Sequence, residues 1–115
     1  MKILKLTLKK EWFDMVLSGE KYEEYREIKP YWIKRLAKGW NFLDAGLTLW
    51  EPGNEMFEPI KFDAVEFTNG YSKSSPMVTK ECQSIDIAVG LYILGAPNVP
   101  VFRIKLGKEV CRLNC

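Results

Sequence analysis

The chain has 115 residues, of which 47% are hydrophobic and 13% aromatic, with a net charge of +2 and no histidine. This length and apolar content suit a single domain, residues 1–115, that buries its own core. The near-neutral charge excludes a strongly basic composition. The lack of histidine removes every Ser-His or Cys-His nucleophile pair and argues against a zinc site. We therefore expect no metal and no cofactor.

The first quarter of the chain predicts a strand, a helix and a second strand. Apolar and polar residues alternate over residues 3–8, which indicates a half-buried strand. Residues 9–17 change to helical spacing, and Gly19 stands where a left-handed helix cap belongs. Alternation returns over the tyrosine-rich residues 22–28, which predicts the second strand.

The middle of the chain predicts one more helix and two strands. Pro30 suits the first position of a short helix, and Gly39 should end it. Residues 47–50 are a candidate strand, closed at residues 51–54 by the turn sequence Glu-Pro-Gly-Asn. The alternation over residues 60–68 is the clearest strand pattern in the chain.

The last third predicts two more strands. Asn69-Gly70 is typical of a two-residue hairpin turn, and the serine-rich residues 72–76 indicate a loop. Strands are expected at residues 77–89 and 101–106, with an irregular segment between them that contains two glycines and two prolines. Five or six short strands with two helices near the N-terminus predict an α+β domain around a small, mostly antiparallel barrel.

The cysteines and the first residues bear on the cellular compartment of the protein. The first six residues alternate charged and apolar side chains without a continuous apolar run, unlike a secretory signal. No segment approaches the ~20 apolar residues that a membrane helix needs. Three cysteines, Cys82, Cys111 and Cys115, cannot all pair with one another, and free thiols in a reducing cytoplasm are the simplest account. We therefore expect a cytoplasmic protein with no membrane partner.

Charge is unevenly distributed along the chain. Residues 1–40 carry ten Lys and Arg against six Asp and Glu, whereas residues 41–83 carry three against seven. This asymmetry permits a local basic patch that could contact phosphates, although an ordinary mixed-charge surface is the alternative.

The most informative pattern follows the first predicted helix. Lys21, Glu24 and Arg26 lie within six residues, just after Gly19. Glu24 and Arg26 are two residues apart and share one face of a strand, whereas Lys21 can join them only from a turn or a bulge. A ladder of surface ion pairs on an edge strand is the alternative to a functional cluster.

This pattern resembles a known family. The sequence Gly-x-Lys-x-x-Glu-x-Arg at residues 19–26, the apolar helix at 12–17 and the late strand at 102–107 resemble the ASCH domain, which belongs to the PUA-like superfamily of RNA-associated pseudobarrels. The segments at 67–72 and 107–108 are similar to a branch of the family found in bacteria and their phages. The resemblance implies a small β-pseudobarrel and a cleft between it and the first helix, with the charged residues of the motif on the wall of that cleft.

The resemblance also implies two functions, which are RNA or nucleotide binding and hydrolysis of an amide on a modified nucleoside. One small bacterial member removes the acetyl group from acetylated cytidine with a lysine, a threonine and a glutamate. The lysine corresponds to Lys21, but the threonine falls on Glu24, so the hydroxyl is missing here. No motif anchors the distant glutamate, for which Glu81 and Asp86 lie in the right part of the chain.

The chemical roles of the motif residues stay open at this point. Lys21 could act as a general base or bind an anion, and Glu24 could act as the base that activates water. Either role fits an amidohydrolase, and a Lys/Glu/Arg cluster also fits a ribonuclease, whereas a purely protein-interacting module is a third class. The partners expected are therefore RNA or a modified nucleoside.

The predicted binding residues extend beyond the motif. Arg26 can make a bidentate contact to a phosphate or to a base edge. Lys10, at the start of the first helix, suits a phosphate, and Asn69 suits a base edge or simply its turn. Tyr71 follows the Asn-Gly turn and is the aromatic residue least expected to be buried. The candidates for stacking a base are Tyr22, Tyr25, Tyr31, Trp32 and Tyr71.

Overall fold

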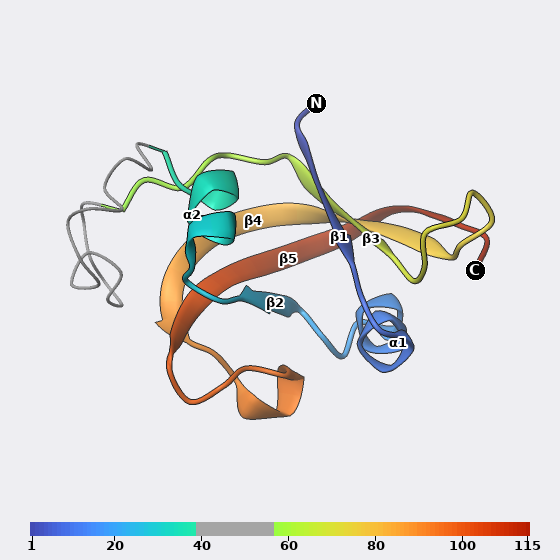
Figure 1. Ribbon diagram of the computed structural model, residues 1–115. Coiled ribbons are helices and arrows are strands. Elements are labelled where there is room, and N and C mark those ends of the chain that lie inside the picture. Colours follow the sequence, from blue (N-terminus) through green and yellow to red (C-terminus); the bar gives the residue numbers. More distant parts are fainter. Residues whose placement is uncertain (39–56) are drawn as a thin grey trace. The chain divides into compact units, whose positions relative to one another are not determined.

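The computed structural model describes residues 1–38 and 57–115, which contain one five-stranded sheet and two α-helices (Figure 1). The elements in chain order are β1 (Ile3–Thr7), α1 (Lys10–Ser18), β2 (Glu23–Arg26), α2 (Pro30–Leu36), β3 (Ala64–Thr68), β4 (Met77–Val89), a 3₁₀ helix (Tyr92–Leu94) and β5 (Pro100–Leu113). The predicted α+β class is confirmed. The strand and turn expected at residues 47–54 lie outside the described residues.

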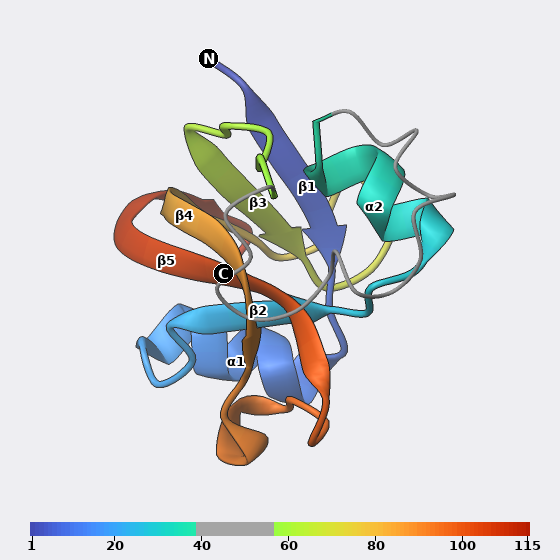
Figure 2. The same ribbon diagram turned by 90° about the vertical axis from the view of Figure 1, so that its left-hand side faces the viewer.

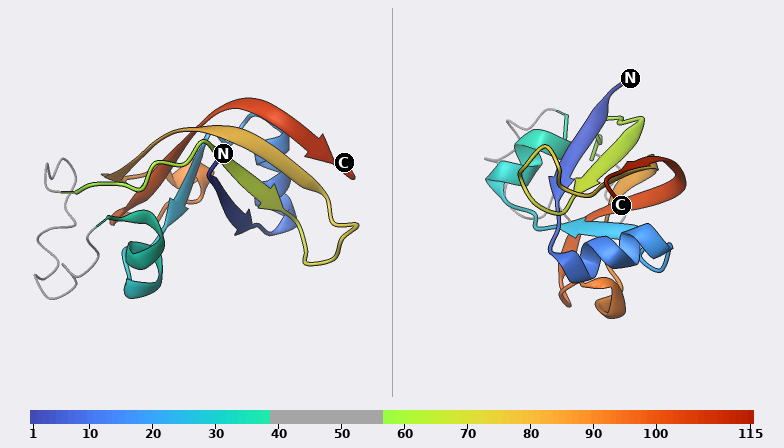
Figure 3. Two further views of the ribbon diagram at one scale, coloured as in Figure 1. Left: turned by 90° about the horizontal axis from the view of Figure 1, so that it is seen from above. Right: turned by 90° about the vertical axis from the view of Figure 1, so that its right-hand side faces the viewer.

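The sheet has the strand order β1-β3-β4-β5-β2 and is mixed. β1 pairs in parallel with β3, with Leu4 opposite Val65, and the two arrows point the same way in Figure 2. β3 pairs with β4 in the antiparallel direction, and the long strands β4 and β5 run side by side in opposite directions (Figure 3). The expectation of antiparallel strands therefore holds for these pairs but not for β1 and β3.

The described residues group into two compact units. Unit 1 comprises Met1–Glu23, Phe62–Gln83 and Lys105–Cys115, and unit 2 comprises Glu24–Lys61 and Ser84–Ile104. Strands β2, β4 and β5 each continue from one unit into the other. The predicted site residues divide in the same way, with Glu24 and Arg26 in unit 2 and Lys10, Lys21, Asn69 and Tyr71 in unit 1.

The core of unit 1 follows the predicted periodicities. β1 buries alternate residues, and α1 buries Phe13 and Val16 one turn apart, as period-2 and period-3.6 patterns require. Gly19 has φ 90° and its N–H donates to Val16 O at 3.2 Å, so the predicted left-handed cap is confirmed. The buried apolar residues of unit 1 are Leu4, Leu6, Leu8, Phe13, Val16, Ala64, Val65, Phe67, Val78 and Leu106.

The core of unit 2 contains α2 and the adjoining halves of β4 and β5. α2 begins at Pro30 as predicted, but its end was predicted wrongly, because the helix stops at Leu36. Ala37 is extended and forms an isolated bridge with Pro59, so the backbone leaves the helix for a partner distant in sequence. The buried apolar residues of unit 2 are Tyr25, Ile33, Leu36, Ala37, Ile85, Ile87, Leu94, Ala96, Val101, Phe102 and Ile104.

The Asn69-Gly70 hairpin prediction is wrong. β3 and β4 are joined by eight residues, 69–76, and the Asn69 N–H donates to Pro76 O at 3.0 Å across the base of this loop. Gly70 has φ 113°, and a Cβ added there would lie 2.7 Å from Ser75 Oγ. The glycine is therefore needed inside a wider serine-rich loop rather than in a two-residue turn.

Three strand boundaries also differ from the prediction. β2 spans only Glu23–Arg26, and β3 starts at Ala64. β5 continues through Gly107 to Leu113. A Cβ at Gly107 would lie 3.1 Å from the Cβ of Glu81, so this glycine marks a close approach of two strands and not a strand end.

A second glycine contact anchors β2 in unit 2. Gly90 follows β4 and lies against the ring of Tyr25, where an added Cβ would overlap the ring and lie 2.7 Å from Ala96 Cβ. The Tyr25 hydroxyl accepts a hydrogen bond from Leu91 N–H at 3.1 Å. Tyr25 is 9% exposed, so its predicted role as a stacking platform is replaced by a structural one.

We expect Gly90→Ala to lower the free energy of unfolding by about 1–3 kcal/mol, because the added methyl group overpacks the Tyr25 contact. Gly107→Ala is the matched control, since its methyl group meets side-chain atoms no nearer than 3.1 Å and should cost clearly less. Urea unfolding followed by tryptophan fluorescence measures both values. Equal losses in the two variants would contradict the packing at Gly90.

Candidate functional site

Lys21 lies in the turn between α1 and β2. Its backbone N–H donates to Met15 O at 2.9 Å, which holds the chain against the last turn of α1. Its side chain is buried, with only 3% of the residue exposed, and its Nζ lies 5.2 Å from the centroid of the Trp12 ring. The face of an aromatic ring attracts a cation. Unit 1 therefore buries a lysine against the first helix.

Glu24 and Arg26 meet on β2, as their spacing predicted. Arg26 Nη2 donates to Glu24 Oε2 at 2.9 Å, and the Tyr25 N–H donates to Glu24 Oε1 at 2.9 Å. Glu24 is 6% exposed, so this is a largely buried ion pair and not the surface ladder that was the alternative. Both carboxylate oxygens are engaged, which disfavours Glu24 as a base that activates water.

The guanidinium group of Arg26 is held from a second side. Its central carbon lies 4.9 Å from the centroid of the Trp32 ring, on helix α2. Arg26 Nε is buried, and among the described residues no hydrogen-bond acceptor reaches it. A buried donor without a partner is costly, so Arg26 Nε is a candidate contact for a ligand. The guanidinium is thus fixed in orientation by Glu24 and Trp32 and still has a donor to offer.

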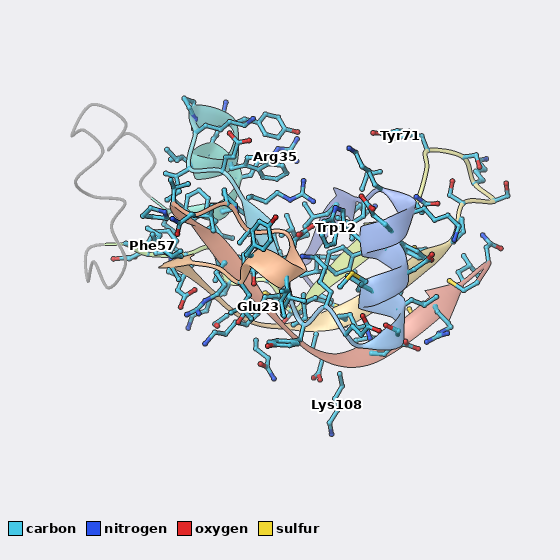
Figure 4. The ribbon with its side chains drawn as sticks, turned by 90° about the horizontal axis from the view of Figure 1, so that it is seen from below. Trp12, Glu23, Arg35, Phe57, Tyr71 and Lys108 are labelled. Carbon is cyan, nitrogen blue, oxygen red and sulfur yellow. The ribbon has the colours of Figure 1, made fainter. Side chains whose placement is uncertain are left out.

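The other predicted binding residues have separate settings in unit 1. Lys10 Nζ forms an exposed i,i+4 ion pair with Asp14 at 2.6 Å. Asn69 Nδ2 donates to Leu8 O at 3.0 Å, so the amide supports the loop instead of facing solvent as a base reader. Tyr71 is 94% exposed and extends away from the ribbon in Figure 4, as its position after the turn predicted.

The two carboxylates considered as a distant catalytic glutamate are also engaged. Glu81 Oε1 accepts a hydrogen bond from Lys108 N–H at 3.0 Å in unit 1. Asp86 makes two hydrogen bonds with Arg103 in unit 2. Burial raises the pKa of the Cys82 thiol, which lowers its thiolate fraction and disfavours it as a nucleophile.

Sequence reasoning missed a further buried charge. Lys80 is 9% exposed and lies two residues from the fully buried Val78, on the same face of β4. Its Nζ lies 3.8 Å from Glu109, which Arg112 also contacts. The hydrogen bonds from Arg112 lower the pKa of Glu109 and keep it charged opposite Lys80. The sequence places Glu109 and Arg112 beyond Gly107 but does not indicate that Lys80 meets them.

Comparisons with protein-family models, curated proteins and solved structures find no match to this chain. Within residues 1–38 and 57–115, no helix has the length and apolarity to cross a membrane. The same residues contain no group of three or more His, Cys, Asp or Glu side chains that could hold a metal ion.

We expect Glu24→Gln to lower the free energy of unfolding by about 1–3 kcal/mol, because Arg26 would keep its charge in a buried place without its carboxylate. Asp14→Asn is the control, since it removes the carboxylate of an exposed ion pair and should cost less than about 0.5 kcal/mol. Chemical denaturation of both variants checks this. Similar small losses would mean that the Glu24–Arg26 pair contributes no more than a surface pair.

Proposed function

We propose that the chain is a cytoplasmic ASCH-type module that binds RNA or a nucleotide-like ligand through Arg26. The Gly-x-Lys-x-x-Glu-x-Arg motif at residues 19–26 supports the family, and a five-stranded mixed sheet with two helices is compatible with a PUA-like pseudobarrel. The observation that carries the proposal is the buried Nε of Arg26, a donor that no described residue satisfies.

The setting of Arg26 suits the recognition of a planar or anionic group. Nε and Nη2 of an arginine can donate two parallel hydrogen bonds to a phosphate or to the acceptor edge of a base. In Arg26, Nη2 carries two N–H groups and donates to Glu24, while Nε has no acceptor among the described residues. Glu24 and Trp32 already restrict the guanidinium, so less conformational entropy is lost when a ligand binds. A lysine at this position could neither stack as a plane nor donate in this fork geometry.

We expect ribonucleoside monophosphates, tested one at a time, to shift the Nε–H resonance of Arg26 in two-dimensional NMR spectra. Arg26→Lys should weaken the binding of the responding nucleotide by roughly 5- to 150-fold, the loss that corresponds to one bidentate contact. Arg112→Lys is the matched control, because Arg112 pairs with a glutamate on the exposed end of β5. If all four nucleotides and a single-stranded RNA leave the Arg26 signal unmoved, the proposal is wrong.

The second candidate function is an amidohydrolase acting on an acylated nucleoside such as acetylated cytidine, and the burial of Lys21 favours it. Burial is the condition under which a lysine can lose its proton near neutral pH and act as a base. Two observations weigh against this function. The Trp12 ring favours the charged form of Lys21, and Glu24 replaces the hydroxyl residue with a carboxylate whose oxygens are already engaged.

The two functions give opposite outcomes in one assay, which is chromatographic detection of cytidine released from acetylated cytidine. If the chain is a binding module, we expect no release above the rate without protein, while the nucleotide-binding signal at Arg26 persists. Turnover that disappears in Lys21→Ala and remains in Lys10→Ala would instead assign hydrolysis to the buried lysine. Thermal melting of both variants shows that they are folded.

A further inference from the structure

The exposed face of α2 combines positive charge with aromatic rings. The helix directs Ile33 and Leu36 into the core of unit 2, and its opposite face exposes Tyr31, Lys34 and Arg35. Residues 29–38 contain four Lys or Arg and no Asp or Glu. This short segment is therefore the most one-sidedly basic stretch among the described residues of unit 2.

The rings and cations of this face, together with Arg26 on β2, form a continuous series of contacts. The Arg26 guanidinium carbon lies 4.9 Å from the Trp32 ring centroid, and the Trp32 and Tyr31 rings meet edge to face with centroids 4.9 Å apart. The Arg35 guanidinium carbon lies 4.5 Å from the Tyr31 centroid. Figure 4 labels Arg35 beside α2. Tyr31 stays 55% exposed within this series.

We propose that Tyr31, Trp32, Lys34 and Arg35, here called the α2 face, are a binding surface for a single strand of nucleic acid. The inference rests on the proposed function and extends it from one nucleotide at Arg26 to the neighbouring nucleotides of the same strand. A base stacks on the exposed Tyr31 ring, and Lys34 and Arg35 contact the phosphates beside it. Aromatic platforms flanked by cations are the usual means of binding single strands.

The composition of the face favours this partner over other anionic ones. An acidic protein surface would need the cations but not an exposed ring. A bilayer or an apolar protein would need exposed aliphatic side chains, whereas the aliphatic residues Ile33 and Leu36 of α2 point into the core. A duplex keeps its bases stacked on one another, so a platform such as Tyr31 has access to bases only in a single strand.

The link through Trp32 explains why the strand should continue from Arg26 to the α2 face. Trp32 contacts both the Arg26 guanidinium and the Tyr31 ring, so the two ligand contacts are separated by only one side chain. A nucleotide held by Arg26 therefore brings its neighbour close to Tyr31. Affinity should then rise with the length of the strand, because the second contact is made within a ligand that is already bound.

The experiment compares fluorescein-labelled oligouridylates of 4, 8 and 12 nucleotides with uridine monophosphate, and with oligothymidylates of the same lengths, by anisotropy and competition. We expect the 12-mer to bind at least tenfold more tightly than the monophosphate. Tyr31→Leu should weaken the 12-mer by roughly 5- to 150-fold, the loss that corresponds to one stacked base. Tyr92→Leu is the matched control, because Tyr92 is a tyrosine 86% exposed on the β4–β5 connection.

A second pair of variants tests the phosphate contacts. Lys34→Gln with Arg35→Gln should reduce the slope of log K against log salt by about 1.4, since each phosphate contact in a single strand contributes about 0.7. Lys5→Gln, on an exposed position of β1, should leave the slope unchanged. The monophosphate should bind these variants and Tyr31→Leu as it binds the unmodified chain. Equal affinity for RNA and DNA would support contacts to phosphates and ring faces, and a preference for RNA would add a contact to the 2′-hydroxyl.

The failures of the two proposals look different in this experiment. If Arg26 binds the monophosphate but affinity does not rise with length, the α2 face is not a binding surface while the proposed function stands. Lack of binding by any nucleotide or oligomer overturns both. Loss of binding in the charge variants alone, with polyaspartate competing as well as the 12-mer, would show a general polyanion surface and overturn the stacked base at Tyr31.

Discussion

The burial of charge on β2 is the constraint on which the rest of the structure depends. A carboxylate taken out of water is tolerated only where donors surround it, and Glu24 receives hydrogen bonds from Tyr25 N–H and Arg26. Arg26 in turn lies on the ring of Trp32, so the side chain that pairs with Glu24 on β2 also connects β2 to α2. The same fixing leaves one donor of the guanidinium without an acceptor among the described residues. The contacts that bury this charge therefore also hold the guanidinium of Arg26 in one orientation.

Local signals were sufficient for the elements whose ends depend on nearby residues. Gly19 ends α1 through its own left-handed conformation, and β4 covers the predicted residues 77–89. Where the end of an element depends on a distant part of the backbone, local patterns did not predict it. α2 stops at Leu36 because the next residue pairs with Pro59, and β5 passes through Gly107 because β4 lies against it. Glycine and asparagine patterns indicate an unusual backbone conformation or a close contact. They do not indicate which neighbouring segment requires it.

The candidate site was predictable to the same extent. The two-residue spacing of Glu24 and Arg26 placed them on one face, where they do pair. The rings beneath the cations of the motif, Trp12 and Trp32, could not be assigned from spacing, because each lies on a helix whose orientation is set by packing. Asn69 carried a pattern with two interpretations, and the structure supports the local one, since its amide binds the backbone at the end of β1. Residue type predicted which chemical groups the site contains. Tertiary contacts determine which of those groups are already paired within the protein.

The contact between Tyr25 and Gly90 has a consequence for how such a chain can evolve. The tyrosine ring fills the space that the glycine leaves, and its hydroxyl is bound by the next residue, Leu91. By strand alternation, Tyr25 points to the opposite side of β2 from Arg26. A substitution at position 90 would therefore shift Tyr25 and, with it, the strand β2 that carries Arg26. Positions 25 and 90 should thus vary together among descendants of this sequence, with a smaller side chain at one accompanying a larger one at the other.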